Sequence, residues 1–200
     1  MLTARQQRAL EYFTTGDNCS QAVFKAYCDL AGLTEDQAAL VAVGFGGGIG
    51  RLRQNCGAFS GAVMICGALQ GADGADESAR AEVYRRVQLA HMKFIEKNGT
   101  INCAELLNRP AQPEDPTPDA RTAEYYASRP CARIVVSACQ VIEELMEEAR
   151  QILLDTLQHC SAQELKEWGT LKNKLRDVLS DYIYGKTKRS PMILPIIMEV

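Results

Sequence analysis

Residues 54–72 read QNCGAFSGAVMICGALQGA and contain no charged side chain. The length of this stretch would allow a membrane-spanning helix. However, it is only weakly apolar, because it includes two glutamines, an asparagine, a serine and four glycines. The stretch therefore predicts a helix from Cys56 to about Leu69 that is buried in a helical protein core. The spacing of Gly57 and Gly61 further predicts close contact with a neighbouring helix.

The predicted buried helix begins at one of four cysteines that share a sequence context. Asn precedes Cys19, Cys56 and Cys103, and Pro130 precedes Cys131. Asn is a preferred N-cap and Pro is tolerated in the first helical turn, so all four thiols are expected at helix starts. Unpaired backbone N–H groups and the helix dipole favour thiolate over thiol at such positions. Four further cysteines lie in apolar helical stripes and are expected to pack as small hydrophobic residues: Cys28, Cys66, Cys139 and Cys160.

Five glycines occur among residues 44–50, a few positions before Cys56. No register of this run matches the G-x-G-x-x-G pattern of dinucleotide-binding proteins. The run is expected either to form a tight turn between two helices or to expose backbone N–H groups as an anion-binding nest. In the second case the expected cofactor-binding residues are Gly46, Gly47, Gly48 and Arg51. Together with Arg53, this loop is then expected to lower the pKa of the Cys56 thiol.

Composition restricts the class of protein. A chain of 200 residues with 46% hydrophobic and 24% charged residues predicts one or two globular domains. The net charge of −3 provides no bulk attraction to nucleic acid or to an anionic membrane surface, so we expect neither as a partner and no membrane span. The first residues lack the apolar segment of a secretory signal, which predicts a cytoplasmic protein with reduced thiols.

Helical periodicity dominates the chain on both sides of the central stretch. It predicts helices over about 4–13, 19–31, 35–43, 77–97, 103–107, 122 onward with a pause at Pro130, and 162–184. Four of the seven prolines fall within 109–119, which predicts an extended, mobile loop. Residues 192–198 predict a strand. The expected fold is mainly α, a compact multi-helix bundle (residues 1–142) followed by a helical tail with one terminal β-strand (residues 143–200).

Five blocks of sequence together carry a resemblance to a known family. They are NCSQAVF (18–24), FGGGIGR (45–51), CGAFSGA (56–62), NGTINCAELL (98–107) and RTAEYYASRPC (121–131). In this order, and with four cysteines aligned, they resemble the redox-active proteins named for a C…GCAxxG…C…C pattern, over about residues 4–142. The central element reads CGAFSG here, with its first two letters exchanged. The resemblance implies a small helical, intracellular protein with a redox or metal-linked role near transporters.

A second resemblance begins near Met146. The segment LRDVLSDYIYGKTKRSPMILPIIMEV (175–200) is similar to the C-terminal end of bacterial ribonuclease J. The resemblance implies a truncated part of a small α/β domain that supports oligomerisation, so we expect the terminal strand either to be disordered or to pair with a second chain in a homo-oligomer. Catalysis in that family needs a metallo-β-lactamase domain with a His-x-His-x-Asp-His ligand set. The two histidines of this chain, His91 and His159, cannot supply that set, which excludes a nuclease of that kind.

Two versions of a thiol-based function follow from the four cysteines at helix starts. In the redox version the chain is a thiol oxidoreductase in which Cys56 is the attacking thiolate, Cys19 or another of the four resolves the mixed disulfide, and a redox protein or a transporter-linked protein is the partner. In the metal version zinc or an iron–sulfur cluster is bound by Cys19, Cys56, Cys103 and Cys131.

Two alternatives from other classes remain open at this point. The chain is then either a non-catalytic oligomerisation or interaction protein whose cysteines only pack the core, or a gene fusion near residues 142–146 whose parts have no joint function.

Overall fold

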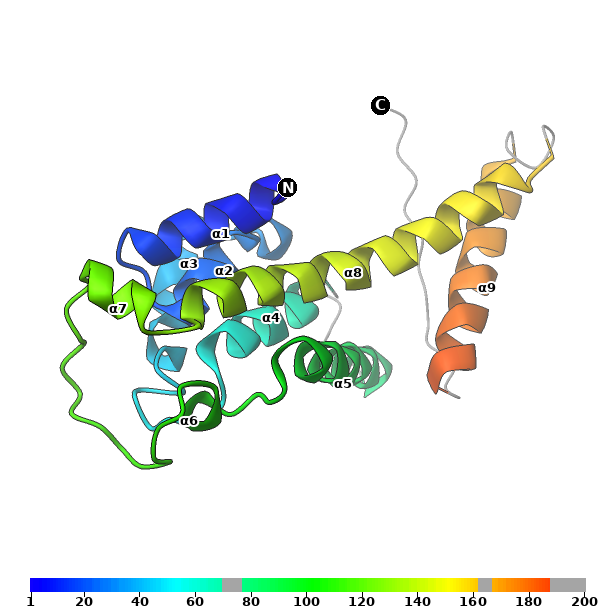
Figure 1. The fold of residues 1–200 in the computed structure, drawn as a ribbon. Helices are drawn as coiled ribbons and strands as arrows, with labels where there is room; N and C mark the ends of the chain where they lie inside the picture. The colour runs from blue at the N-terminus through cyan, green and yellow to red at the C-terminus, as the bar shows by residue number, and fades with distance from the viewer. Residues whose placement is uncertain (70–76, 162–166, 188–200) are drawn as a thin grey trace.

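The computed structural model describes residues 1–69, 77–161 and 167–187, and within these ranges the chain is helical (Figure 1). The expected multi-helix bundle is confirmed. The expected β element is wrong, because the described residues form no strand and contain only an isolated antiparallel bridge between Asn55 and Asn102. A strand needs a neighbouring strand for its backbone hydrogen bonds, and the described chain offers helices instead. The segment 192–198 itself lies outside the described residues.

Helix α4 (Gly57–Ala68) occupies the centre of the bundle, as its lack of charge predicts. It packs against α2 (Cys19–Lys25), α5 (Glu77–Asn98) and the first part of α8 (Cys131–Gln158). The predicted close helix contact is confirmed, because a β-carbon on Gly57 would lie 2.5 Å from Cys19 Sγ and one on Gly61 would lie 2.9 Å from Val23 Cβ. None of the described helices is both long enough and apolar enough to cross a membrane.

The remaining helices of the bundle surround this centre. Helix α1 (Ala4–Thr14) lies across α2 and α8, and α2 is followed by η1 (Cys28–Ala31), α3 (Glu35–Ala42) and η2 (Val43–Phe45). The short helices α6 (Cys103–Leu106) and α7 (Ala123–Ala127) lie beside the same end of the bundle (Figure 1). Capping boxes at Thr3, Asn18 and Thr34 fix the starts of α1, α2 and α3, because each cap side chain accepts a bond from an otherwise unpaired amide.

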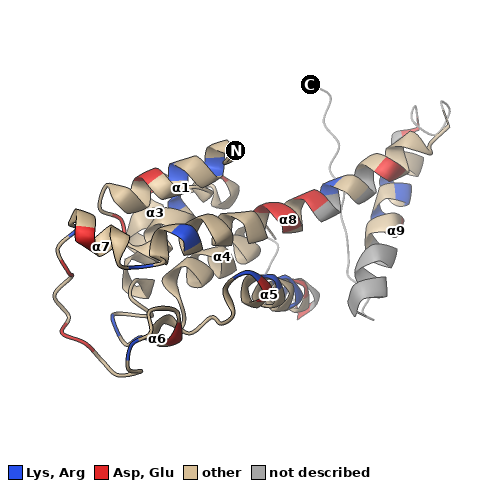
Figure 2. Ribbon diagram, viewed as in Figure 1, with Lys and Arg blue, Asp and Glu red and all other residues tan. Residues whose placement is uncertain are grey.

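Helix α8 extends beyond the bundle, and α9 (Trp168–Thr187) packs along its far half (Figure 1). The boundary expected between 142 and 143 falls inside this one continuous helix. Acidic residues gather where α8 leaves the bundle (Figure 2). There Glu144 pairs with Lys97 of α5 at 2.7 Å, and Glu143 accepts a hydrogen bond from Gln6 Nε2 of α1 at 2.6 Å.

Candidate functional site

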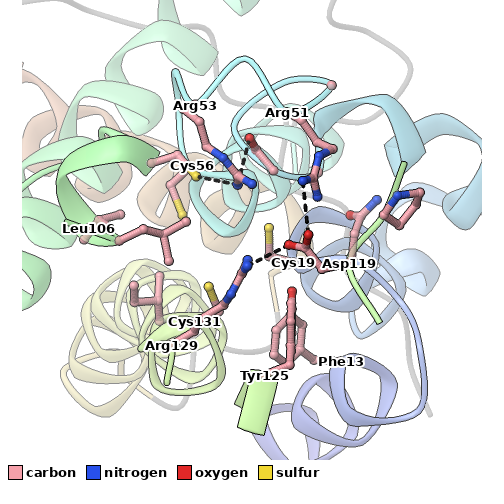
Figure 3. A pocket seen from close by; sticks show the side chains of 18 of the residues that line it. Phe13, Cys19, Arg51, Arg53, Cys56, Leu106, Asp119, Tyr125, Arg129 and Cys131 are labelled. Atoms are coloured by element: carbon pink, nitrogen blue, oxygen red, sulfur yellow. Dashed lines mark hydrogen bonds and ion pairs between the residues drawn. The ribbon is translucent and has the colours of Figure 1, made fainter. Parts of the chain in front are cut away.

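The four cysteines predicted at helix starts line one pocket of about 330 Å³ (Figure 3). Cys19, Cys103 and Cys131 are the first residues of α2, α6 and α8, and Cys56 is the N-cap residue of α4. The predicted helix starts are therefore confirmed. Four segments that are far apart in the sequence thus bring their first turns to one end of the bundle.

A short backbone pairing joins two of these segments. The Cys56 N–H donates to the Ile101 carbonyl at 2.7 Å, and the Cys103 N–H donates to the Gln54 carbonyl at 2.6 Å. These bonds flank the bridge between Asn55 and Asn102, so two of the repeated Asn-Cys dipeptides lie antiparallel to each other. The repeat therefore has a structural consequence, because the pairing places the starts of α4 and α6 side by side.

The third Asn-Cys dipeptide is held by the glycine-rich loop. Asn18 caps α2, and its side-chain Nδ2 also donates to the Val43 carbonyl at 2.9 Å. A β-carbon on Gly46 would lie only 2.5 Å from the Asn18 side chain, so this glycine lets the loop approach the cap. Because Cys19 Sγ also contacts Gly57, the next residue after Cys56, the start of α2 lies directly against the start of α4.

The backbone of residues 44–50 forms a tight turn that uses its own hydrogen-bonding groups. The N–H groups of Ile49, Gly50, Arg51, Arg53 and Gln54 donate to carbonyls of residues 44–48. Of the amides expected to form an anion-binding nest, those of Gly46 and Arg51 are therefore engaged by carbonyls of the chain itself. Of the predicted cofactor-binding residues, Gly46, Gly47 and Arg51 line the pocket, whereas Gly48 is buried against Cys103, where a β-carbon would lie 2.6 Å from Cys103 Cβ.

The turn directs two arginine side chains toward the pocket. Arg53 is 2% exposed and its Nη1 lies 3.8 Å from Cys103 Sγ, while Nη2 pairs with Glu114. Arg51 Nη2 contacts Glu114 at 3.0 Å. It also contacts Asp119 at 3.2 Å (Figure 3). Burial disfavours the charge of Arg53, but Glu114 and Cys103 outweigh it and raise the pKa of the guanidinium.

The proline-rich segment 109–119 is attached to the pocket by these carboxylates. It contributes Pro116, Pro118 and Asp119 to the lining, and Asp119 also accepts a 2.6 Å bond from Arg129. The side-chain bond from Arg53 is the main reason that the pKa of Glu114 falls to about 2. Ion pairs therefore fasten a segment for which the sequence predicts an extended, mobile loop.

The opposite wall of the pocket is aromatic and carries two more arginines. The guanidinium of Arg121 lies 5.1 Å from the ring centre of Phe13 and 4.7 Å from that of Tyr125, and Arg129 lies 4.3 Å from Tyr125. Aromatic rings attract such cations through their electron-rich faces. From the sequence, Tyr125 and Tyr126 either line a pocket near Cys131 or are ordinary core and rim residues. The structure places Tyr125 in the pocket lining (Figure 3).

Burial controls the ionisation of the thiols. Cys56 is only 6% exposed. Desolvation, with a further contribution from Cys19, raises the pKa of its thiol well above the ordinary value. The amides of Ala58 and Phe59 lower that pKa only in part. The expectation of a lowered pKa at Cys56 is therefore wrong. Desolvation outweighs the helix start, and the nearby guanidinium of Arg53 faces Cys103 instead.

The other buried thiols behave in the same way. Burial raises the pKa of Cys103, although the bond from Arg53 opposes this, and burial raises the pKa of Cys131 to about 12. A charge on Cys19 contributes to the raised pKa of both. Cys19 itself is half-buried, and its sulfur lies in the middle of the pocket (Figure 3).

The expected metal centre lacks a suitable donor arrangement. All eight cysteines lie among the described residues, and each has a free thiol. Within the described part of the chain, no group of three His, Cys, Asp or Glu side chains is arranged to hold a metal ion. Of the cysteines expected to pack in the core, Cys28, Cys66 and Cys139 are buried, and Cys160 is half-buried just beyond the end of α8.

Sequence reasoning did not identify the two carboxylates that pair with the pocket arginines, Glu114 and Asp119. They lie in a segment whose prolines indicate only an irregular loop. Their partners Arg51 and Arg53 are more than 60 residues away, so no local spacing connects them. The only signal in the sequence is the charge pattern. Acidic residues lie in the proline-rich segment, and two arginines follow the glycine run, so the two segments carry opposite charges.

Curated relatives match the chain over a limited length. Ribonuclease J2 of Bacillus subtilis is 28% identical over 114 residues, which is 57% of this chain and 19% of that protein. Ribonuclease J 2 of Streptococcus pyogenes is 35% identical over 57 residues, or 28% of this chain and 10% of that protein. The chain thus spans only a small part of the curated relatives that it matches. No solved structure matches it significantly.

Two family models match the chain, and they overlap on α8. The model of the ribonuclease J C-terminal domain matches residues 131–200. The other model matches residues 17–145, a range that contains the glycine-rich loop, the arginines and all four cysteines of the pocket. Because this second match covers more than half of the chain, the protein belongs to the family described as "Putative redox-active protein (C_GCAxxG_C_C)".

Proposed function

We propose that this protein is a thiol–disulfide oxidoreductase in which Cys19 is the attacking thiol and Cys56 is the resolving thiol. The observation that carries the proposal is that four free thiols from four separate helix starts line one pocket. Membership of a redox-active family supports the same reading. Packing alone does not require four cysteines at one cavity, since other small residues fill such positions equally well.

Exposure and charge favour Cys19 as the thiol that reacts first. Cys19 is half-buried and faces the cavity, whereas Cys56 is only 6% exposed. Burial, and after it a charge on Cys19, raises the pKa of Cys56 and of Cys131. When Cys19 is a thiolate, the thiols around it therefore tend to keep their protons. This arrangement provides one nucleophile surrounded by neutral thiols, one of which can resolve a mixed disulfide.

The reaction is a thiol–disulfide exchange with a disulfide-containing acceptor. The Cys19 thiolate attacks one sulfur of the acceptor, so a mixed disulfide forms and the other acceptor sulfur leaves as a thiolate. The Cys56 thiol then loses its proton to solvent and attacks Cys19, which forms the Cys19–Cys56 disulfide and releases the second acceptor sulfur. The protein is oxidised by two electrons and the acceptor disulfide is reduced to two thiols. The start of α2 against the start of α4 supports this pairing.

Oxidised glutathione provides the test. The reduced protein is incubated with it, remaining thiols are counted, and new disulfides are mapped by peptide mass spectrometry. We expect the loss of two thiols, a Cys19–Cys56 disulfide and full reversal by dithiothreitol. Cys56→Ser is expected to accumulate a glutathione adduct at Cys19, and Cys19→Ser is expected to remain reduced. Cys160→Ser, which removes a half-buried thiol outside the pocket, serves as the matched control.

Three results would contradict the proposal. The first is wild-type protein that keeps all its thiols under these conditions. The second is oxidation that proceeds normally in Cys19→Ser. The third is purified protein that holds a stoichiometric metal ion which Cys19→Ser no longer retains, because thiolates engaged by a metal are not free for exchange.

A further inference from the structure

The pocket carries more positive than negative charge. Its lining includes four guanidinium groups, from Arg51, Arg53, Arg121 and Arg129, and one carboxylate, from Asp119. Even when Glu114 is counted at its edge, two positive charges are in excess. The raised pKa values of Cys56, Cys103 and Cys131 keep these three thiols neutral, so they do not offset this charge. Low-dielectric walls strengthen the resulting field, so the cavity attracts an anion more strongly than the net charge of the chain indicates.

Several N–H groups in this lining have no hydrogen-bond partner. The Nε atoms of Arg51 and Arg53 and Nη1 of Arg121 are buried and unpaired. Arg53 gives the strongest evidence for a missing acceptor, because its Nε is unpaired although the whole residue is only 2% exposed. Nearly all buried donors in folded proteins are paired, and leaving a donor of a charged group unpaired is especially unfavourable. Unpaired donors on three arginines around one cavity therefore indicate an acceptor that completes the site.

Arg121 is the cation best placed to bind such an acceptor. Among the described residues it has no carboxylate partner, whereas Arg51 has two and Arg53 and Arg129 have one each. Its Nη2 donates to the Asp17 carbonyl at 3.1 Å, and its plane packs near Phe13 and Tyr125. The side chain is thus already held in position with one side of its guanidinium unpaired. A positioned guanidinium suits the planar, two-oxygen face of a carboxylate or an oxyanion.

The size and the acceptor content of the cavity restrict the ligand further. A volume of about 330 Å³ is at the small end of ligand pockets, which range over roughly 300–1,000 Å³. Arginine offers donors and no acceptors. The one carboxylate in the lining, Asp119, is already engaged by Arg51 and Arg129. A cationic ligand would therefore find no free counter-charge, and a folded partner could not enter.

We infer that this pocket binds a small anionic molecule, with its carboxylate or oxyanion group on Arg121 beside Cys19. The inference deepens the proposed function, on which it rests for the statement that the bound anion is the substrate. The binding itself rests on the arginines and their unpaired donors alone. Apolar side chains in the same lining, among them Phe13 and Ile134, would contact the uncharged part of the molecule.

Two alkylating reagents of similar size, one anionic and one neutral, test the inference. In both, the Cys19 thiolate attacks the methylene carbon, an S–C bond forms, the C–I bond breaks, iodide leaves and the thiol proton is lost to solvent. Iodoacetate carries a carboxylate and iodoacetamide is neutral. We expect the ratio of the iodoacetate rate to the iodoacetamide rate at Cys19 to exceed the ratio for N-acetylcysteine by roughly tenfold, the scale of one charged hydrogen bond.

Arg121→Gln is expected to remove that excess, because it deletes the unpaired guanidinium and leaves a shorter, uncharged polar side chain. Arg150→Gln is the matched control, because it removes the same charge at an exposed position on α8. Among the described residues Arg150 pairs only with Glu147. Peptide mass spectrometry assigns the modified cysteine in each case. An unchanged ratio in Arg121→Gln, or a wild-type ratio equal to that of N-acetylcysteine, would overturn the inference.

Thermal unfolding gives a readout that does not depend on thiol chemistry. Sodium sulfate and sodium acetate are each compared with sodium chloride at equal ionic strength, in the wild type and both variants. We expect at least one of the two anions to stabilise the wild type and Arg150→Gln more than Arg121→Gln. Stabilisation by sulfate alone identifies an oxyanion site, and stabilisation by acetate alone identifies a carboxylate site. Equal stabilisation of all three proteins contradicts anion binding.

A Cys19 thiol that reacts with neither alkylating reagent would contradict the proposed function. The thermal unfolding data would still decide whether the pocket binds an anion.

Discussion

Gly57 is the residue at which two helix starts make their closest contact. A β-carbon there would lie 2.5 Å from Cys19 Sγ and 2.8 Å from the Phe45 carbonyl oxygen. We therefore expect Gly57→Ala to lower the free energy of unfolding by roughly 1–3 kcal/mol, as is usual for added atoms in a packed core. The new methyl group also displaces Cys19, so the rate of Cys19 alkylation should change. Urea unfolding and peptide-resolved alkylation measure these two effects.

The same helix offers a control for Gly57→Ala. Nothing lies within 4 Å of a β-carbon on Gly67, near the other end of α4. Gly67→Ala is expected to stabilise the protein by up to about 1 kcal/mol, because alanine loses less backbone entropy in a helix than glycine. Equal stabilities of the two variants would show that the contact between Gly57 and Cys19 is not tight.

The raised pKa values of the buried thiols predict a loss of stability in alkali. Burial raises the pKa of Cys131 to about 12, whereas the thiol ionises near 9 once it is exposed in the unfolded chain. Between these two values the unfolded state loses its proton and the folded state keeps it, so the free energy of unfolding falls as pH rises from about 9 to 12. Unfolding of Cys131→Ser in dithiothreitol should depend less steeply on pH in this range, whereas Cys160→Ser should follow the wild type.

Local sequence was a good guide to the cysteine positions and a poor guide to their chemistry. The cap residues Asn18 and Asn102 act within one helical turn, so their consequence is readable from neighbouring letters. The pKa of Cys56 instead depends on how completely other helices cover it, which no local pattern contains. The sequence pointed to glycine amides and Arg51 as anion donors, whereas the unpaired buried donors of the pocket, on Arg51, Arg53 and Arg121, depend on contacts that no local pattern contains.

At the scale of elements, the proline-rich segment 109–119 acts as a strap across the arginines. The pKa of Glu114 is about 2, held down chiefly by Arg53, and the carboxyl of an unfolded chain ionises near 4.5. A lowered pKa gives stability that is present above pH 4.5 and is lost as pH falls toward 2. We expect alkylation of Cys103, which lies under Arg53, to accelerate relative to free thiol over this acidic range as the strap is released.

Glu114→Gln tests the strap at neutral pH. The variant removes the charge that pairs with Arg51 and Arg53, and we expect the free energy of unfolding to fall by about 1–3 kcal/mol while Cys103 becomes more reactive. Asp115→Asn is the matched control. The pKa of Asp115 is lowered chiefly by its bond to Thr117. Asp115→Asn therefore removes a neighbouring carboxylate charge whose main interaction is within the same short turn. Identical behaviour of the two variants would rule out a special role for Glu114.

The helices themselves were largely predictable, whereas their arrangement was not. Capping boxes and apolar spacing fix bounds such as those of α1 and α3 through contacts within one turn. The bridge between Asn55 and Asn102 joins residues almost 50 positions apart, and only the folded chain reveals that it aligns two cysteines. The β element was wrongly expected because an apolar, β-branched run indicates a strand only where a partner strand exists.

At the scale of the whole molecule, α8 belongs to two parts at once. Its first residue, Cys131, lines the pocket, and its far half packs against α9 (Figure 1). Both family matches include residues 131–145, so the junction between them is a shared helix rather than a linker. Thr156 of α8 and Leu171 and Leu175 of α9 are buried where the two helices pack, and none of them belongs to the hydrophobic core cluster of the bundle. The two parts are therefore joined by a continuous backbone but stabilised by separate sets of side chains.

This separation predicts that a destabilising substitution in α9 affects only α9 and the far half of α8, and not the helical bundle. Leu171 is 8% exposed, so Leu171→Ala should cost the α8–α9 contact about 2–5 kcal/mol, the usual range for a buried leucine. We expect faster hydrogen exchange throughout α9 and the far half of α8, with unchanged exchange in α4 and unchanged alkylation of Cys19. Lys172→Ala, at the exposed neighbouring position, should change neither. If Leu171→Ala instead accelerated exchange in α4, the pocket and the tail would unfold as one cooperative unit, and α8 would couple them despite its length.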